Sequence, residues 1–398
     1  MATLSLCMIV KNEATRLSAC LKSACSSVDE IIVLDTGSTD DTIAIAQQFN
    51  ASVKSHPWNN DFAEARNVSL KYVTGDWILV LDADECLADG IGPRLRDVIE
   101  RENDSLVVNL VRQEIGAAQS PYSLVSRLFR NHPDIQFTRP YHAMVDDSVA
   151  DILSREPHWK VQELSEIAIL HDGYRVEAIA SRNKLQSARL TMERFLSQHP
   201  GDPYVCSKLG ALYAELDRPT YGIELLERGL KASSLESSIA YELHYHLGIV
   251  YSKMNCVAQA LYHYEQAIAQ PIMPALKLGA YNNLGSVRQT TGDLEEATLA
   301  FEKTIAIDPK FAMGHFNLGM VLKSKGQLSD AIAQYQQAIQ LQPDYAEAYQ
   351  NLGVVLLKIG HVTQSMESFQ RAIALHEQRN PDEAQRLREG LKGMGFIL

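Results

Sequence analysis

Short apolar runs alternate with amphipathic segments from residue 3 to about residue 110. Five runs have the length and the β-rich composition of strands: Leu4–Val10, Glu30–Leu34, Ser52–Ser55, Trp77–Leu81 and Ser105–Leu110. Between them lie stretches with the period of a helix, at 13–26, 40–49, 61–73 and 90–101. This alternation predicts a mostly parallel sheet covered by helices. Residues 111–175 lack strong helical periodicity, so we expect short strands and loops there that complete the sheet.

From about residue 177 the pattern is continuously helical and then becomes periodic. The pairs Leu284-Gly285, Leu318-Gly319 and Leu352-Gly353 follow one another in steps of 34 residues, and a second glycine and an aromatic residue keep the same step. A 34-residue period of this kind is the signature of tetratricopeptide (TPR) repeats. The small residues let two helices approach closely, and the aromatic residue fills the space between them.

Two weaker copies of this motif, Leu209-Gly210 and Leu247-Gly248, lie upstream. They extend the prediction to five helical hairpins over about 203–379, followed by a capping helix near 381–392. We therefore predict an α/β domain, a helical linker and an all-α repeat array, at 1–176, 177–202 and 203–398.

Composition narrows the choice of partners and compartment. The net charge of −12 argues against nucleic acid, because binding to phosphate backbones needs a concentrated basic face. The six cysteines form no C-x-x-C pair, as expected of free thiols in a reducing compartment. The apolar N-terminus has no basic segment before it, and no apolar run reaches the roughly 18–20 residues that span a membrane. We expect a cytoplasmic protein without a transmembrane segment.

Polar side chains follow three of the predicted strands. Lys11-Asn12-Glu13 follows the first strand, Asp35–Asp41 the second, and Asp82-Ala83-Asp84-Glu85 the fourth. Parallel strands end on one rim of a sheet, where ligands collect. The two carboxylates of the Asp-x-Asp motif suit Mn²⁺ or Mg²⁺, which prefer few protein carboxylates together with phosphate oxygens. A polar turn before the next helix is the alternative.

The second of these clusters contains one residue that helix capping does not explain. Capping of the following helix accounts for Ser38, Thr39, Asp40 and Asp41. Asp35 precedes the cap, so its carboxylate is left to accept a base N–H or a ribose hydroxyl.

Residues 4–90 resemble the family 2 glycosyltransferases of the GT-A fold. The resemblance rests on the runs Ser5–Glu13, Asp35–Asp40, Ala65–Asn67 and Gly75–Glu85, in this order and at the spacing of the family. The whole chain resembles the subgroup that joins this domain to TPR repeats, with relatives among lipopolysaccharide-core and sublancin-type peptide glycosyltransferases. The resemblance implies a metal-dependent glycosyltransferase of the hexosyltransferase type. Its donor is expected to be a nucleotide sugar, with UDP-sugars as the first candidates, and the transfer is expected to invert the anomeric carbon.

The resemblance also implies which residues hold the donor. The nucleotide sugar is expected to contact six residues, namely Val10, Asn12, Glu13, Asp35, Arg66 and Asp82. Asp84 is expected to bind the metal. His171, in the run His171-Asp172-Gly173-Tyr174, is expected to supply a further metal ligand or to touch the diphosphate. A hinge turn before the helical half is the alternative for that run.

The acceptor side departs from the family pattern. Relatives carry Gly-x-x-His-Glu downstream of an Arg-Leu-Phe-Arg segment, whereas this chain has Arg139-Pro140-Tyr141-His142-Ala143. Ala143 stands where the carboxylate that acts as general base is expected. Three side chains remain as candidates for that base: Asp146, Asp147 and His142.

Three functions stay open at this point. Glycosyl transfer leads because four motifs converge on one rim, with the repeats recognising a protein or peptide acceptor or a partner, a second copy of the chain included. A catalytically degenerate domain that binds nucleotide sugars and acts as a scaffold is the alternative, motivated by Ala143. A nucleotidyltransferase ranks last, because Lys11-Asn12-Glu13 is not the Gly-rich basic loop that it needs after the first strand.

Overall fold

The computed structural model describes residues 1–101, 104–117, 119–172 and 182–396. The chain forms two compact units, Met1–Ala232 and Ser233–Leu398. The predicted boundary at residues 176 and 177 lies outside the described residues, and so do Gly173 and Tyr174. The predicted division into three segments therefore stays a prediction.

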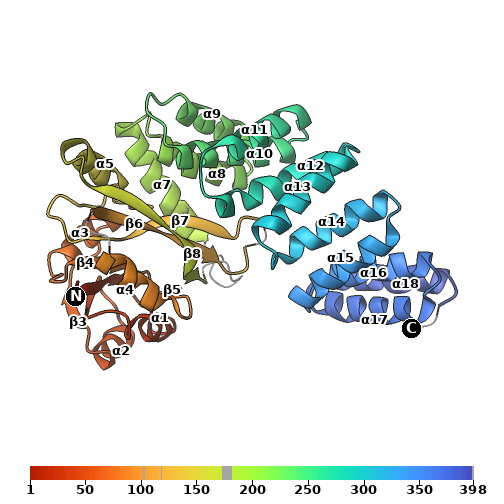
Figure 1. Ribbon diagram of the computed structural model, residues 1–398, viewed down its shortest axis with the longest axis horizontal. Coiled ribbons are helices and arrows are strands. Elements are labelled where there is room, and N and C mark those ends of the chain that lie inside the picture. The colour runs from red at the N-terminus through yellow and green to blue at the C-terminus, as the bar shows by residue number, and fades with distance from the viewer. Residues whose placement is uncertain (102–103, 118, 173–181, 397–398) are drawn as a thin grey trace. The chain divides into compact units, whose positions relative to one another are not determined.

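An eight-stranded sheet forms the centre of the N-terminal unit (Figure 1). Its strand order is β3-β2-β1-β4-β7-β6-β8-β5. The strands are β1 Leu4–Val10, β2 Glu30–Asp35, β3 Ser52–Ser55, β4 Trp77–Val80, β5 Glu85–Leu87, β6 Ser105–Glu114, β7 Tyr122–Arg130 and β8 Lys160–His171. The first four are parallel to one another and β6 is parallel to β8, whereas β7 and β5 pair in the antiparallel sense. The predicted α/β fold with a mostly parallel sheet is confirmed.

Helices cover both faces of this sheet. One face packs against α1 Leu17–Ala24, α2 Thr42–Gln48 and α4 Ile91–Arg101. The other face packs against α3 Phe62–Leu70 and α5 Asp146–Arg155. Side chains of β1 alternate between the two cores, as the period of a strand requires.

Helix α5 was not expected from the sequence. It begins at Asp146, where we predicted a loop. Val145, Val149 and Ile152 recur at helical spacing and bury one face of α5 against the sheet. The period covers fewer than three turns, which is why the β-rich sequence around it obscured the helix.

Three helices complete the N-terminal unit: α7 Arg182–Gln198, α8 Pro203–Glu215 and α9 Pro219–Leu230. Met192 and Leu196 of α7 form a buried cluster with Val205 and Leu209 of α8. Tyr141 of the α/β part packs against the same cluster. The hairpin of α8 and α9, which is the first of the predicted hairpins, thus shares a core with the segment that precedes α5.

The C-terminal unit consists of helical hairpins. Its elements are α10 Ser237–Lys253, α11 Val257–Ala269, η1 Pro274–Lys277, α12 Leu278–Thr290, α13 Leu294–Ile307, α14 Ala312–Ser324, α15 Leu328–Leu341, α16 Ala346–Lys358, α17 Val362–Arg379 and α18 Pro381–Gly393. A Cβ atom on Gly319 would lie only 2.7 Å from the ring of Tyr335, which is fully buried. The close helix approach that the repeat motif predicts is therefore present, and the all-α repeat fold is confirmed. Among the described residues, every helix is too short or too polar to span a lipid bilayer.

Candidate functional site

Two loops at the carboxyl ends of β1 and β2 are joined by hydrogen bonds. The backbone N–H of Asn12 donates to Ser38 Oγ (2.9 Å), and Asn12 Oδ1 accepts the N–H of Thr39 (2.8 Å). Asn12 has a positive φ of 55°, which asparagine tolerates better than most residues. The N–H of Glu13 donates to Thr42 Oγ1 (2.8 Å) at the start of α2. The loops after β1 and β2 therefore form one rigid wall.

The carboxylate of Asp35 organises the second of these loops. It accepts the backbone N–H groups of Gly37 (3.0 Å) and Ser38 (3.1 Å), and its side chain is buried. Gly37 has φ +106°, a conformation that suits glycine. The oxygens of Asp35 are thus partly occupied by its own loop, and its contact with a base stays a prediction.

The capping of α2 differs from the expectation. Asp41 occupies the N-cap position, but its side chain makes no capping hydrogen bond. Asp40 does this instead, because its Oδ1 accepts the N–H of Thr42 (3.1 Å). Ser38 and Thr39 are used in the contact with Asn12.

Asp82 is held between two arginines. Its Oδ1 accepts from Arg66 Nη2 at 2.8 Å, and its Oδ2 accepts from Arg127 Nη2 at 2.7 Å. Burial alone would raise the pKa of Asp82, but the guanidinium groups of Arg127 and Arg66 outweigh it and hold that pKa well below its usual range. Both oxygens of this ionised carboxylate are therefore already engaged.

The sequence interpretation missed the charged network around Asp82. Arg112 of β6 pairs with Glu85 (2.8 Å), whose side chain is fully buried, and with Glu114 (2.8 Å). Arg127 of β7 begins the Arg-Leu-Phe-Arg segment of this chain, to which the sequence interpretation gave no role. The available signal was the i, i+2 spacing of Arg112 and Glu114, which places both on one face of a strand.

Asp84 lies beside His171, as the predicted pair of metal ligands requires. Asp84 Oδ2 is 3.5 Å from His171 Nε2, and His171 Nδ1 is 2.5 Å from Glu114 Oε2. Burial lowers the pKa of His171, but the carboxylates of Asp84 and Glu114 outweigh it and raise that pKa to about 9. The two carboxylates on either side of the imidazole thus favour its protonated form.

The donor atoms here fit a divalent cation. A metal-binding histidine usually gives its second nitrogen to a carboxylate, and Glu114 stands in that place. Within the described ranges, no cluster of three or more His, Cys, Asp or Glu side chains is arranged to hold a metal by itself. Asp84 and His171 would hold Mn²⁺ or Mg²⁺ only together with phosphate oxygens and water, which is how these ions usually bind.

The loop of residues 131–145 contains the departure from the family pattern and is called the acceptor loop here; Arg139 ties it to the hairpin of α8 and α9. The guanidinium group of Arg139 pairs with Asp147 (2.5 Å) and with Asp202 (2.8 Å), the N-cap residue of α8, and lies over the ring of Tyr204. Arg139 has φ +70°, a backbone conformation that suits glycine. A strained backbone is thus maintained by three contacts of the side chain.

The three candidates for the general base have different surroundings. Asp147 is engaged by Arg139. His142 is exposed, has φ +53° and makes ring contacts with Tyr141 and Tyr204. Asp146 accepts from Ser126 Oγ of β7 (2.8 Å), and burial raises its pKa.

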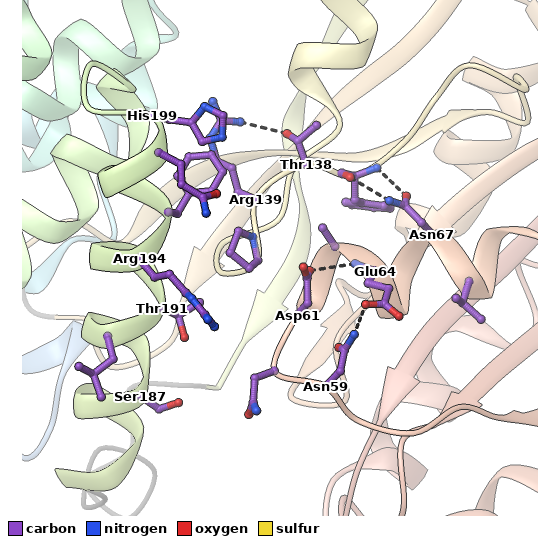
Figure 2. Close-up of a pocket in the computed structure, with 18 of the residues that line it drawn as sticks. Asn59, Asp61, Glu64, Asn67, Thr138, Arg139, Ser187, Thr191, Arg194 and His199 are labelled. Atoms are coloured by element: carbon purple, nitrogen blue, oxygen red, sulfur yellow. Dashed lines mark hydrogen bonds between the residues drawn. The ribbon is translucent and has the colours of Figure 1, made fainter.

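A cleft lies between α3 and α7 (Figure 2). Its volume is about 1020 Å³, and segment 137–140 of the acceptor loop lines it together with both helices. Arg194 and Thr191 of α7 face Asp61 and Asn59 across it in Figure 2. Asp82 and Asp84 do not line this cleft, which is therefore separate from the paired carboxylates.

Comparisons with known proteins support both the predicted family of the N-terminal domain and the predicted repeats. The model of "Glycosyl transferase family 2" matches residues 5–162. Models of tetratricopeptide repeats match residues 278–311, 300–333, 319–360 and 346–379. A TPR repeat-containing protein of Synechococcus elongatus is 41% identical over 309 residues, which cover 78% of this chain and 76% of that protein.

Two further relatives match the N-terminal part. The SPbeta prophage-derived glycosyltransferase SunS of Bacillus subtilis is 28% identical over 233 residues, which cover 57% of this chain and 53% of SunS. An uncharacterized glycosyltransferase of Rickettsia felis is 29% identical over 201 residues, which cover 47% of this chain and 69% of that protein. The chain belongs with the TPR repeat-containing proteins and carries an N-terminal domain of glycosyl transferase family 2.

Proposed function

We propose that this chain transfers a sugar from a nucleotide sugar, first of all a UDP-sugar, to an acceptor with inversion and with the help of a divalent cation. The observation that carries the proposal is that the neighbouring carboxylates of Asp82 and Asp84 have different partners. Asp82 is locked by Arg66 and Arg127, whereas Asp84 lies beside the imidazole of His171. Asp82 thus stabilises this rim of the sheet, and Asp84 is available to a ligand.

The donor would be held along the rim from β2 to β4. The wall that Asn12 and Glu13 form with the second loop supports a contact with the base and the ribose, and Val10 and Asp35 end the two strands below it. A divalent cation at Asp84 and His171 would neutralise charge on the diphosphate as it leaves. Arg66 and Arg127 lie next to Asp82, and each keeps a buried N–H group without a hydrogen-bond partner within the described residues.

We propose Asp146 as the general base. Its raised pKa brings it closer to the range in which a carboxylate accepts a proton efficiently near neutral pH. Asp146 would take the proton of the acceptor as the acceptor attacks the anomeric carbon. The bond from that carbon to the diphosphate breaks, and the nucleoside diphosphate leaves with the electron pair. Asp147 and His142 remain the other candidates.

The acceptor is proposed to be a protein or peptide that the TPR repeats help to recognise. The link from the acceptor loop through Arg139 to the N-cap of α8 supports this division of work. Because the hairpin of α8 and α9 lies next to the acceptor loop, a chain held by that hairpin would be presented from that side. A scaffold that only binds nucleotide sugars is the competing function, and Ala143 is the observation that favours it.

Calorimetry of the full chain with UDP and GDP, in the presence of Mn²⁺ or Mg²⁺, tests the proposal. We expect metal-dependent binding of at least one of these diphosphates, and loss of that binding in Asp84→Ala. If neither diphosphate binds with either metal, the proposed function is wrong. Binding without any donor hydrolysis would favour the scaffold.

A further inference from the structure

Arg16 is the most open arginine beside the paired carboxylates. It directly precedes α1, three residues after Glu13, and its Nη1 lies 3.5 Å from Asp84 Oδ2. Its side chain is 36% exposed, whereas those of Arg66 and Arg127 are 8% and 11% exposed. A solvent-borne ligand that reaches Asp84 therefore meets Arg16 as well.

Arg16 also makes a weaker ion pair than the other arginines of this site. Arg66 and Arg127 donate to Asp82, and Arg112 pairs with Glu85 and Glu114 at 2.8 Å. Over the described part of the chain, the one ion pair found for Arg16 is that with Asp84, and 3.5 Å is longer than the roughly 2.7–2.9 Å of a charge-assisted hydrogen bond. The guanidinium group is attracted to Asp84 without being fixed by it.

The position of Arg16 suits contact with a phosphate rather than a role in the fold. Its side chain makes no capping hydrogen bond to α1, and the helix is held at this end by the backbone, through the carbonyl of Glu13. A planar guanidinium group presents several N–H donors in a geometry that matches two phosphate oxygens. A cation bound at Asp84 would repel Arg16 from its present partner and leave an anion as its natural contact.

We infer that Arg16 binds the β-phosphate of the nucleotide and makes this site prefer nucleoside diphosphates over monophosphates. This inference rests on the proposed function, because it assumes that the nucleotide binds along the same rim. Arg16 is then the residue that holds the leaving group, while Arg66 and Arg127 remain with Asp82.

The test compares UDP with UMP, and GDP with GMP, by calorimetry of the full chain in Mn²⁺. The variants are Arg16→Gln and, as matched control, Lys22→Gln, which removes an exposed positive charge from the last turn of the same helix. A hydrogen bond to a charged group contributes roughly 1.5–3 kcal/mol, so we expect Arg16→Gln to weaken diphosphate binding about 10- to 100-fold. Monophosphate binding should change less than about twofold, and Lys22→Gln should bind as the wild type does.

Two results would overturn the inference. One is an equal loss of monophosphate and diphosphate affinity in Arg16→Gln. The other is an unchanged ratio of these affinities together with tighter binding of Mn²⁺ alone, which would mean that Arg16 only shields Asp84. Failure of the wild-type protein to bind any diphosphate is a different outcome, because it contradicts the proposed function itself. Thermal unfolding of Arg16→Gln shows whether the variant is folded.

Discussion

His171 and Glu114 share a hydrogen bond of 2.5 Å between Nδ1 and a carboxylate oxygen, across neighbouring parallel strands. The pairing of β6 with β8 places Glu114 opposite His171, and the pairing of β5 with β8 places Glu85 opposite the same residue. The orientation of the imidazole is thus set by the register of the sheet. Its other nitrogen is left facing Asp84.

We expect Glu114→Gln to weaken the binding of Mn²⁺ about 10- to 100-fold, because a metal-binding histidine loses basicity and orientation with its carboxylate partner. Electron paramagnetic resonance of Mn²⁺ with the full chain measures this directly. Glu163→Gln removes an exposed carboxylate from the same strand β8 and should leave the affinity unchanged. Wild-type affinity in Glu114→Gln would show that His171 is not a ligand held in this way.

Asp82 and Asp84 should differ in their effect on stability. Asp82→Asn leaves the buried guanidinium groups of Arg66 and Arg127 without their shared carboxylate, and leaving a buried charge without its partner costs about 3 kcal/mol. Asp84→Asn removes weaker contacts, so its cost should stay below about 1 kcal/mol. Urea unfolding at pH 7.5 compares the two variants. Equal losses of stability would contradict the structural role assigned to Asp82.

Two variants of Arg139 separate the cost of its strained backbone from the contribution of its side-chain contacts. Arg139→Ala loses the ion pairs with Asp147 and Asp202 but keeps the unfavourable φ of +70°. Arg139→Gly loses the same contacts and relieves the strain, which costs a residue with a Cβ roughly 1–2 kcal/mol. We therefore expect the glycine variant to be more stable than the alanine variant by about 1 kcal/mol, measured by thermal unfolding. The reverse order would show that the strain is not real.

A pair of histidines should make the C-terminal unit sensitive to acid. His244 and His263 approach at 2.9 Å between their Nδ1 atoms, and burial, together with the charge that His263 would carry, lowers the pKa of His244 to about 4. The unfolded chain binds this proton near pH 6.5, so the stability is complete above that pH and is lost as the pH falls toward 4. Between pH 7.5 and pH 5 we expect a loss of roughly 1–2 kcal/mol in urea unfolding.

The chain itself provides the matched variant for this test. His315 and Gln334 stand at the corresponding positions of a later hairpin, with 2.8 Å between Nδ1 and the amide oxygen. His263→Gln copies that pair, in which the amide oxygen accepts a hydrogen bond from the imidazole N–H. This variant should keep the stability at pH 7.5 and lose most of the dependence on acid. An unchanged dependence would place its origin elsewhere.

Local patterns were enough to predict the strands of the rim and the repeats. β1 and β3 begin and end where the apolar runs do, and Asp82 and Asp84 follow β4 as expected. The 34-residue step predicted the contact of Gly319 with the ring of Tyr335. These features depend on residues close in sequence or on a repeated motif, and both kinds of pattern can be recognised in a single sequence.

The charged network could not be predicted in the same way. Arg112 and Arg127 lie on strands whose neighbours are set by long-range pairing, and only the register of β6 with β7 and β8 decides which carboxylates they meet. The two arginine partners of Asp82 come from other elements and were not anticipated, while its contact with the donor stays a prediction. Asp146 looked like a loop residue because α5 is short. In each case the deciding contact joins residues far apart in the chain.

Hydrolysis of nucleotide sugars by the full chain tests the central claim most directly. With water as the acceptor, UDP-sugars are incubated with Mn²⁺ or Mg²⁺, and the released diphosphate is measured for the wild type and for Asp84→Ala. We expect metal-dependent release that Asp84→Ala abolishes while the variant remains folded. Release that is independent of metal, or that survives in Asp84→Ala, would contradict the assignment of Asp84 as the carboxylate that serves the donor.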